Sequence, residues 1–333
     1  MTIGAPAALR QPPGAGEVAG RLAKLIGCSR GVLGTSTLHL FLDLFTILSK
    51  DPVAIFVDDG IYPIARWGVE QAAARGTPVK IFRHRDPTDL QRLLQRSIGN
   101  GRRPVVVSDG FCPGCGRVAP IYEYLKSIRR FGGQLILDDT QALGVLGQKP
   151  TPAGPYGIGG GGSLQWSGVR GADIVVVNSL AKAFGVPVAV LAGGRGLVKR
   201  FEQESSTRIH CSPPSVAAIQ AAQQAIEING QEGDMLRQRL MRLVSRFRRR
   251  LESKGLKVAG TLFPVQGLAP IPGLDVYEVY ERLLELKVRT ILKRSHLGPG
   301  AQLALIITTD HSPRQIDKTT AILSSTVRSV MNR

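Results

Sequence analysis

Residues 172–185 read ADIVVVNSLAKAFG, a short apolar run that ends in polar residues and a lysine. A β-branched run of this length is typical of a strand that is buried on both faces of a sheet. Lys182 follows the strand after a few residues. A lysine in such a place is costly unless its charge is paired or its amine takes part in covalent chemistry. The stretch therefore predicts a buried sheet with a reactive amine at its edge.

Similar apolar runs occur along the chain on both sides of this stretch. They are AIFVDDG (54–60), PVKIFRH (78–84), PVVVSDG (104–110), QLILDDT (134–140) and VAVLAGG (188–194). Several are separated by amphipathic segments with helical periodicity, at 66–76, 86–98 and 119–133. This alternation predicts an α/β fold with a mostly parallel sheet flanked by helices. The glycine- and proline-rich residues 147–171 predict a flexible surface loop.

The composition changes twice along the chain. Residues 1–16 are rich in alanine, proline and glycine, which predicts an N-terminal arm. Residues 17–229 carry the strand and helix alternation and are expected to form the large domain. Residues 230–333 combine a basic helix with shorter strand and helix patterns, which predicts a smaller α+β domain.

Composition excludes some classes of protein. No apolar run is long enough to span a bilayer and no signal peptide is evident, so we expect a cytoplasmic protein. Four cysteines do not make a disulfide scaffold. The net charge of +18 is concentrated in part in the helical segment 235–257, where leucines form an apolar stripe. We interpret its arginines as a solvated face, with a polyanion site as the alternative. Aromatic residues are only 5% and do not interleave with the basic ones, so we do not expect nucleic-acid binding to be the function.

Polar residues follow three of the predicted strands at the point where each strand ends. Asp109 follows PVVV, Asp138 follows QLIL, and Ser179 and Lys182 follow DIVVV. In open α/β sheets ligands bind beyond the carboxyl ends of the strands. We therefore expect these side chains to meet around a ligand.

The motifs at these strand ends resemble those of fold-type I pyridoxal-phosphate enzymes, specifically the α-oxoamine synthase group. NSLAKAFG resembles the segment that carries the Schiff-base lysine, and LILDDTQALGVLG the one whose first aspartate binds the pyridine nitrogen. GTSTLHLF resembles the phosphate-binding turn, and SDGFCPGCGRVAPI a segment ahead of the aspartate strand. The resemblance implies pyridoxal 5'-phosphate as cofactor, a homodimer, and the two-domain aminotransferase-like fold.

The resemblance assigns roles residue by residue. Lys182 would bind the cofactor covalently and Asp138 would hold its pyridine nitrogen protonated, and these two are the implied catalytic residues. The residues implied to contact the cofactor elsewhere are Ser36, Thr37, Leu38, Tyr62, Asp109, Gln141 and Ser179.

The sequence departs from the family pattern at three positions. Gln141 replaces a histidine and cannot act as an acid or base near neutral pH. Tyr62 lies near the position of the histidine that stacks on the ring. Ala304 stands where the family has an arginine for the substrate carboxylate, and Arg294 or His296 are the possible substitutes.

The motif Cys112-Pro-Gly-Cys115 is open to three interpretations. It is half of a structural zinc site, a redox pair, or a plain turn. A zinc site needs two more ligands, and His210 and Cys211 are the only close pair of candidates. We expect a turn and no metal.

The sequence thus predicts a pyridoxal-phosphate-dependent transferase that acts on an amino acid. Decarboxylative condensation with an acyl thioester, either acyl-CoA or an acyl carrier protein, is the reaction that the resemblance implies. An aminotransferase or lyase on the same scaffold is the alternative within enzymes. A catalytically degenerate homologue that acts as a partner subunit is the alternative outside them.

Overall fold

The computed structural model describes residues 4–98, 101–294 and 300–332, and of Arg294 only the backbone. The chain divides into two compact units, and each is described by itself. The first comprises Met1–Phe111 and Val118–Gly233, and the second comprises Cys112–Arg117 and Asp234–Arg333. Within the described residues, no helix combines the length and apolar character needed to cross a bilayer.

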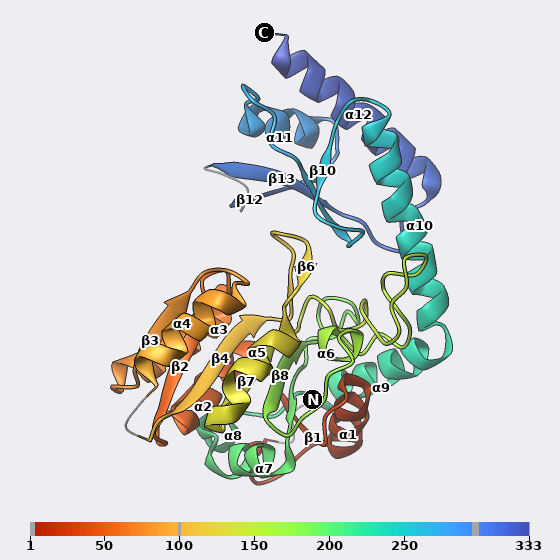
Figure 1. Ribbon diagram of the computed structural model, residues 1–333. Helices are drawn as coiled ribbons and strands as arrows, with labels where there is room; N and C mark the ends of the chain where they lie inside the picture. The colour runs from red at the N-terminus through yellow and green to blue at the C-terminus, as the bar shows by residue number, and fades with distance from the viewer. Residues whose placement is uncertain (1–3, 99–100, 295–299, 333) are drawn as a thin grey trace. The chain divides into compact units, whose positions relative to one another are not determined.

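The first unit is built on a seven-stranded sheet with the order β1-β9-β8-β7-β4-β2-β3 (Figure 1). The strands are β1 (Arg30–Gly34), β2 (Val53–Asp58), β3 (Val79–Phe82), β4 (Arg103–Asp109), β7 (Gln134–Asp138), β8 (Ile174–Ser179) and β9 (Ala189–Gly193). β3, β2, β4, β7 and β8 run parallel, whereas β9 is antiparallel to both β8 and β1. The predicted mostly parallel sheet is confirmed.

Helices cover both faces of this sheet. Alternate residues of a strand point to opposite faces, so Val106 packs in one hydrophobic cluster and Val105 in the other. The first cluster includes residues of α1 (Ala15–Ile26), α4 (Pro87–Ser97), α5 (Ile121–Ile128) and α9 (Val216–Gln231). The second includes residues of α2 (Thr37–Leu48), α3 (Pro63–Ala74) and α7 (Arg195–Glu204). Burial on both faces explains why the central strands read as continuous apolar runs.

The segment 147–171 differs from the prediction of a flexible surface loop. It contains the short helix α6 (Ser163–Trp166), and Gln148 and Ile158 form an antiparallel bridge within it. The Trp166 indole N–H donates to the carbonyl of Pro155 at 2.9 Å, and Tyr156 is 3% exposed. The glycines allow the chain to reverse direction several times. The segment therefore forms contacts within itself and has regular local structure.

The N-terminal residues are attached to the first unit by backbone hydrogen bonds. The N–H of Ala7 donates to the carbonyl of Cys211, and that of Ala8 donates to Arg208 in the short helix α8 (Ser206–His210). Part of the predicted arm therefore packs against the chain.

The second unit holds a four-stranded antiparallel sheet with the order β10-β11-β13-β12. Its elements are β10 (Val258–Ala259), β11 (Val265–Leu268), β12 (Ile291–Arg294), β13 (Ala301–Ile306), α10 (Gly233–Glu252), α11 (Val276–Glu285) and α12 (Pro313–Met331). The predicted leucine-rich stripe of α10 is buried, with Leu243, Phe247 and Leu251 at most 4% exposed. The predicted smaller α+β ending is confirmed.

A hairpin of β5 (Phe111–Cys112) and β6 (Arg117–Val118) lies between β4 and α5 along the chain, followed after α5 by a 3₁₀ turn (Arg129–Phe131). The tip of the hairpin, residues 112–117, belongs to the second unit, which the sequence did not indicate. There the Thr261 hydroxyl donates to the Gly116 carbonyl at 2.6 Å. The predicted domain boundary at residue 230 stays a prediction. The division into compact units says which residues pack together, and it does not say which segments fold independently.

Candidate active site

The carboxyl ends of the parallel strands meet at one edge of the first unit's sheet. Asp58, Asp109, Asp138 and Ser179 are the last residues of β2, β4, β7 and β8. Asp109 and Asp138 are direct partners in the register of β4 and β7. The sheet therefore gathers three of the sequence-predicted strand ends at one place, as expected from the α/β fold.

Asp138 is a buried carboxyl group with few hydrogen-bond donors. It is 7% exposed, and the backbone N–H of Thr140 donates to its Oδ1 at 3.1 Å. Burial raises the pKa of Asp138, while Thr140 and the charge of Lys182 act in the opposite direction. Such a carboxyl gains from a cation placed against it, because the cation offsets the desolvation of the charged form.

Lys182 lies in the loop 180–188 that joins β8 to the antiparallel β9. The loop is closed by a hydrogen bond from the Leu180 N–H to the Val188 carbonyl at 2.8 Å. At its start the Ala181 N–H donates to the Ser179 hydroxyl at 3.2 Å. Lys182 itself is exposed, and its ammonium group acts electrostatically on Asp138. The amine and the carboxyl of the predicted pair therefore belong to the same edge.

Thr140 connects these two strand ends, a role that was not predicted from the sequence. Its hydroxyl accepts the N–H of Ser179 at 3.0 Å, while its own N–H donates to Asp138. The signal was present in the motif DDTQ, since an aspartate side chain commonly accepts the backbone N–H of the residue two positions later. Thr140 thus holds the strand end with Asp138 against the strand end that leads to Lys182.

The start of α2 reaches the same edge through the antiparallel strands. Gly34 of β1 pairs with Ala189 of β9, which pairs with Ser179 of β8. The helix α2 begins three residues after Gly34. Ser36, Thr37 and Leu38 are consequently carried to the edge that holds the strand ends.

Ser36 is the N-cap of α2. Its hydroxyl accepts the N–H of His39 at 3.4 Å and lies 3.0 Å from His39 Nδ1, which is also 3.0 Å from the Thr35 hydroxyl. The first N–H groups of a helix lack intrahelical partners and favour an anion. Thr37 and Leu38 supply such groups here. His39, which the sequence left without a role, orders the two hydroxyls beside them.

Tyr62 and Asp109 are joined by a hydrogen bond. The Tyr62 N–H, at the start of α3, donates to Asp109 Oδ1 at 3.1 Å, and the Tyr62 side chain is 55% exposed. Burial, then the neighbouring Asp138, raises the pKa of Asp109 well above its usual range. Asp109 therefore fixes the backbone from which Tyr62 projects.

Gln141 is half-buried in the turn that follows Asp138.

Asp139, the neighbour of Asp138, points into the protein. It is fully buried, and the N–H of Ser163 at the start of α6 donates to its Oδ2 at 2.8 Å. Burial raises the pKa of Asp139 to about 7. The two adjacent aspartates therefore differ in role, because Asp139 anchors the segment 147–171.

Asp58 is the acceptor of a dense hydrogen-bond network that the sequence did not predict. Five donors reach it: His84 Nδ1 at 2.6 Å, the N–H groups of Gly60 and Arg85, and the hydroxyls of Ser108 and Tyr124. Burial opposes ionisation, but the hydrogen bonds and His84 together lower the pKa of Asp58. This carboxylate holds together the segments after β2 and β3.

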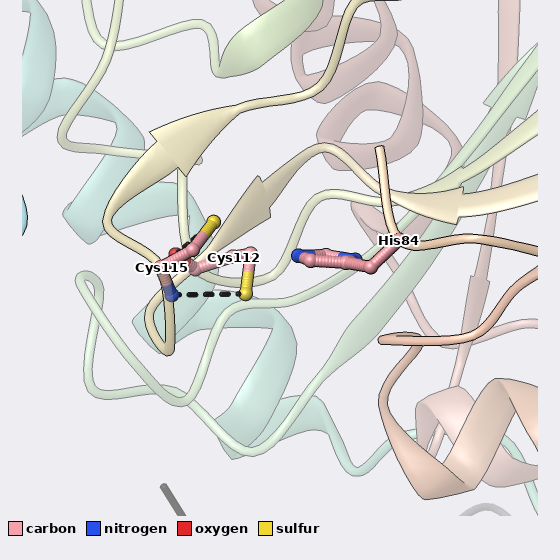
Figure 2. A group of neighbouring side chains, drawn as sticks. All are labelled: His84, Cys112 and Cys115. Carbon is pink, nitrogen blue, oxygen red and sulfur yellow. Dashed lines mark hydrogen bonds between the residues drawn. The ribbon is translucent and has the colours of Figure 1, made fainter. Parts of the chain in front are cut away.

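The Cys112–Cys115 turn is compact and reduced. Figure 2 shows the Cys115 N–H donating to Cys112 Sγ, at 3.4 Å, and it also draws His84 of the first unit. Both cysteines are free thiols. The Cys115 thiol and burial raise the pKa of Cys112, so this thiol is protonated near neutral pH. The hydrogen bond between the two cysteines closes a tight turn, and the choice between a plain turn, half of a zinc site and a redox pair stays a prediction.

Ala304 occupies the middle of β13 in the second unit. It pairs with Gly267 and Ile291 and is fully buried. A methyl group cannot bind a carboxylate, so this position lacks the arginine of the family pattern. The possible substitutes lie outside the described residues, namely His296 and the side chain of Arg294.

The residues of the first unit fit pyridoxal phosphate. Its ring nitrogen is a cation when protonated, and Asp138 is a buried carboxyl whose sole donor in the described hydrogen bonds is Thr140. Its aldehyde requires an amine, which Lys182 offers from an exposed loop. Its phosphate requires N–H donors, which the start of α2 offers.

Comparison with known proteins gives a consistent result. The model of the family "Aminotransferase class I and II" matches residues 8–317. The 8-amino-7-oxononanoate synthase of Alkalilimnicola ehrlichii is 31% identical over 259 residues, which cover 77% of this chain and 63% of that protein. The enzyme of the same name from Halorhodospira halophila is 31% identical and covered to 61%. The chain thus spans about three fifths of the length of these curated relatives.

Solved structures share the fold. Serine palmitoyltransferase from S. paucimobilis superposes with a TM-score of 0.84 at 17% identity, over 100% of this chain and 81% of that one. The 8-amino-7-oxononanoate synthase from Francisella tularensis gives a TM-score of 0.74 at 19% identity, over 96% and 88%. The predicted fold-type I architecture is confirmed.

Proposed function

Because the chain belongs to the aminotransferase class I and II family, we propose that it is a pyridoxal-phosphate-dependent transferase acting on an amino acid. In the proposed reaction the α-carbon of the amino acid bonds to the carbonyl carbon of an acyl thioester. The carboxyl group leaves as CO₂ and the thiol is released. The observation that carries this proposal is Lys182, which lies in a turn at the same sheet edge as the buried Asp138 and acts on it electrostatically.

The chemistry is divided between two residues. Bound pyridoxal phosphate supplies a ring that withdraws electrons from the α-carbon of the amino acid. Asp138, as an anion, would keep the ring nitrogen protonated and so would maintain that withdrawal. The Lys182 amine is the group that would attach the cofactor, and once free it would move a proton at the substrate α-carbon.

Other residues would position the cofactor. The N–H groups of Thr37 and Leu38, with the hydroxyls of Ser36 and Ser179, would bind the phosphate. Tyr62 would stack on the ring, since Asp109 fixes its backbone. Gln141 would donate a hydrogen bond to the phenolic oxygen, in place of the family's histidine.

The acyl donor and the assembly are parts of the proposal. An acyl-CoA or an acyl carrier protein would supply the thioester, and both carry negative charge that suits the basic chain. We expect a homodimer, which light scattering of the purified protein checks.

The proposal is tested by reducing the purified protein with borohydride in the presence of pyridoxal phosphate and mapping the modified peptide. We expect a pyridoxyl group on Lys182 in the wild type. Lys182→Ala should lose the adduct, whereas Lys199→Ala, an exposed lysine of α7, should keep it. An adduct at another lysine only, or none at all, would refute the proposal.

One observation favours a second candidate on the same scaffold. Ala304 lacks the guanidinium that would bind a substrate carboxylate, so an aminotransferase or lyase acting on an amine is the alternative. A transaminase converts the cofactor to its amine form with a single substrate, which absorbance spectra detect. Release of thiol from an acyl thioester would instead identify the condensation. A protein without any turnover that still binds the cofactor would be the degenerate partner subunit.

A further inference from the structure

Five arginines form a stripe along one side of α10 in the second unit. They are Arg239, Arg242, Arg246, Arg249 and Arg250, and we call them the arginine stripe. At about 100° per residue their side chains fall within an arc roughly 100° wide. The centre of this arc lies roughly 110° around the helix from the buried stripe of Leu243, Phe247 and Leu251. The stripe is about 17 Å long, at roughly 1.5 Å per residue.

A single carboxylate in the described part of the chain pairs with this stripe. Asp317 of α12 lies 2.7 Å from Arg246 Nε through Oδ1 and 2.5 Å from Arg246 Nη2 through Oδ2. Arg250 Nε also reaches Oδ1 at 3.0 Å. These hydrogen bonds lower the pKa of Asp317 to about 2, so the carboxylate stays ionised.

The remaining three arginines of the stripe have no such carboxylate. Arg239, Arg242 and Arg249 are exposed, and no acidic side chain pairs with them in residues 4–98, 101–294 and 300–332. Asp317 shows how this surface binds an anion: a neighbouring helix presents a carboxylate, and the planar guanidinium receives it through two hydrogen bonds.

We infer that the arginine stripe is a docking surface for an acidic helix of a partner protein. The partner would present carboxylates at intervals of three or four residues, in register with Arg239, Arg242 and Arg249. Each partner carboxylate would accept hydrogen bonds from an arginine of the stripe, as the Asp317 carboxylate of α12 does from Arg246. The inference stands apart from the proposed function, because the stripe contains none of the residues proposed to hold the cofactor.

Two other kinds of partner fit the surface less well. Single-stranded nucleic acid is commonly held by basic residues interleaved with exposed aromatic ones, and Phe247, the one aromatic residue of α10, is buried. A membrane surface requires apolar side chains beside the basic ones. Met235, 57% exposed, is the one large exposed apolar side chain of α10. A second copy of this chain would carry the same net charge of +18, which opposes association through the stripe.

The test measures binding of the full-length protein to a fluorescent, alanine-rich helical peptide with glutamates spaced to match the stripe. A peptide of the same composition, with glutamates distributed around the helix, is the control ligand. The double variant Arg242→Glu/Arg249→Glu should weaken binding of the matched peptide by about tenfold. The control variant Arg96→Glu/Lys199→Glu reverses two exposed charges of the first unit, and it should change binding by less than about twofold.

A neutral variant, Arg239→Gln/Arg242→Gln, should give an intermediate loss if charge pairing is the cause. Equal losses in the stripe and control variants would overturn the inference, because net charge alone would then explain binding. Equal affinity for the two peptides would also overturn it. So would tighter binding of duplex DNA or of phosphatidylserine vesicles that the stripe variant abolishes, since the stripe would then serve a nucleic acid or a membrane.

Discussion

Asp58 and Asp138 end two strands of the same parallel sheet, yet their surroundings are opposite. Asp58 receives five donors and is a stable anion, whose pKa is lowered despite burial. Asp138 receives the N–H of Thr140, and burial raises its pKa. The protein itself supplies the hydrogen-bond donors that the first carboxylate needs, whereas the second has few donors in the described residues. The number of donors therefore separates a structural aspartate from a candidate ligand-binding one.

The largest expected effect comes from removing the charge at the under-satisfied position. Asp138→Asn should reduce turnover by about a thousandfold, because the amide cannot hold a proton on the ring nitrogen. Its free energy of unfolding should stay equal or rise slightly, since a desolvated charge is removed. Steady-state kinetics and urea unfolding of the same preparation measure the two quantities. A variant that unfolds easily but turns over normally would reverse the assignment of the two aspartates.

The converse change should affect stability and leave the cofactor in place. Asp58→Ala leaves buried donors such as the Tyr124 hydroxyl without an acceptor, so we expect a loss of about 3 kcal/mol in unfolding free energy. Urea denaturation gives the value, and borohydride labelling at Lys182 shows whether the cofactor is still held. Loss of labelling at a temperature where the variant is folded would mean that Asp58 belongs to the site.

The smallest expected effect is a dependence of the unfolding free energy on pH, caused by the raised pKa of Asp139. Its folded-state pKa of about 7 lies above that of an unfolded aspartate, so the folded state binds the extra proton between these values. The stabilisation is therefore present at low pH and is lost as the pH rises towards 7. From pH 5 to pH 6.5 the wild type should lose roughly 2 kcal/mol relative to Asp139→Asn. Urea unfolding at several pH values measures both proteins. If their unfolding free energies changed with pH in the same way, Asp139 would not have a raised pKa in the folded state.

The sheet was predictable because its strands are buried on both faces. Runs such as those ending at Asp109 and Asp138 can only be interior strands, and the polar residues after them mark the edge. The antiparallel direction of β9 and the strand β1 could not be predicted. β1 has the sequence RGVLG, in which two glycines leave too little apolar pattern to identify a strand.

Sequence motifs identified the residues that we propose contact the cofactor. They did not identify the residues whose hydrogen bonds hold those residues in place. Ser179 and Lys182 stand in a recognisable segment, but Thr140 gains its meaning from a hydrogen bond across two strands. The network of Asp58 joins residues up to 66 positions apart, a relation that local patterns do not encode. Sequence thus predicts which groups are present at the edge, and packing determines which of them are already satisfied.

The loop 180–188 returns directly into the adjacent antiparallel strand, and Leu180 and Val188 close it by a backbone hydrogen bond. Because the loop backbone is held where it leaves one strand and enters the next, folding has already restricted the positions that the Lys182 backbone can adopt, and that part of the conformational entropy is not lost again on binding. In the proposed function, the cofactor aldehyde would therefore reach an amine whose backbone is already in place.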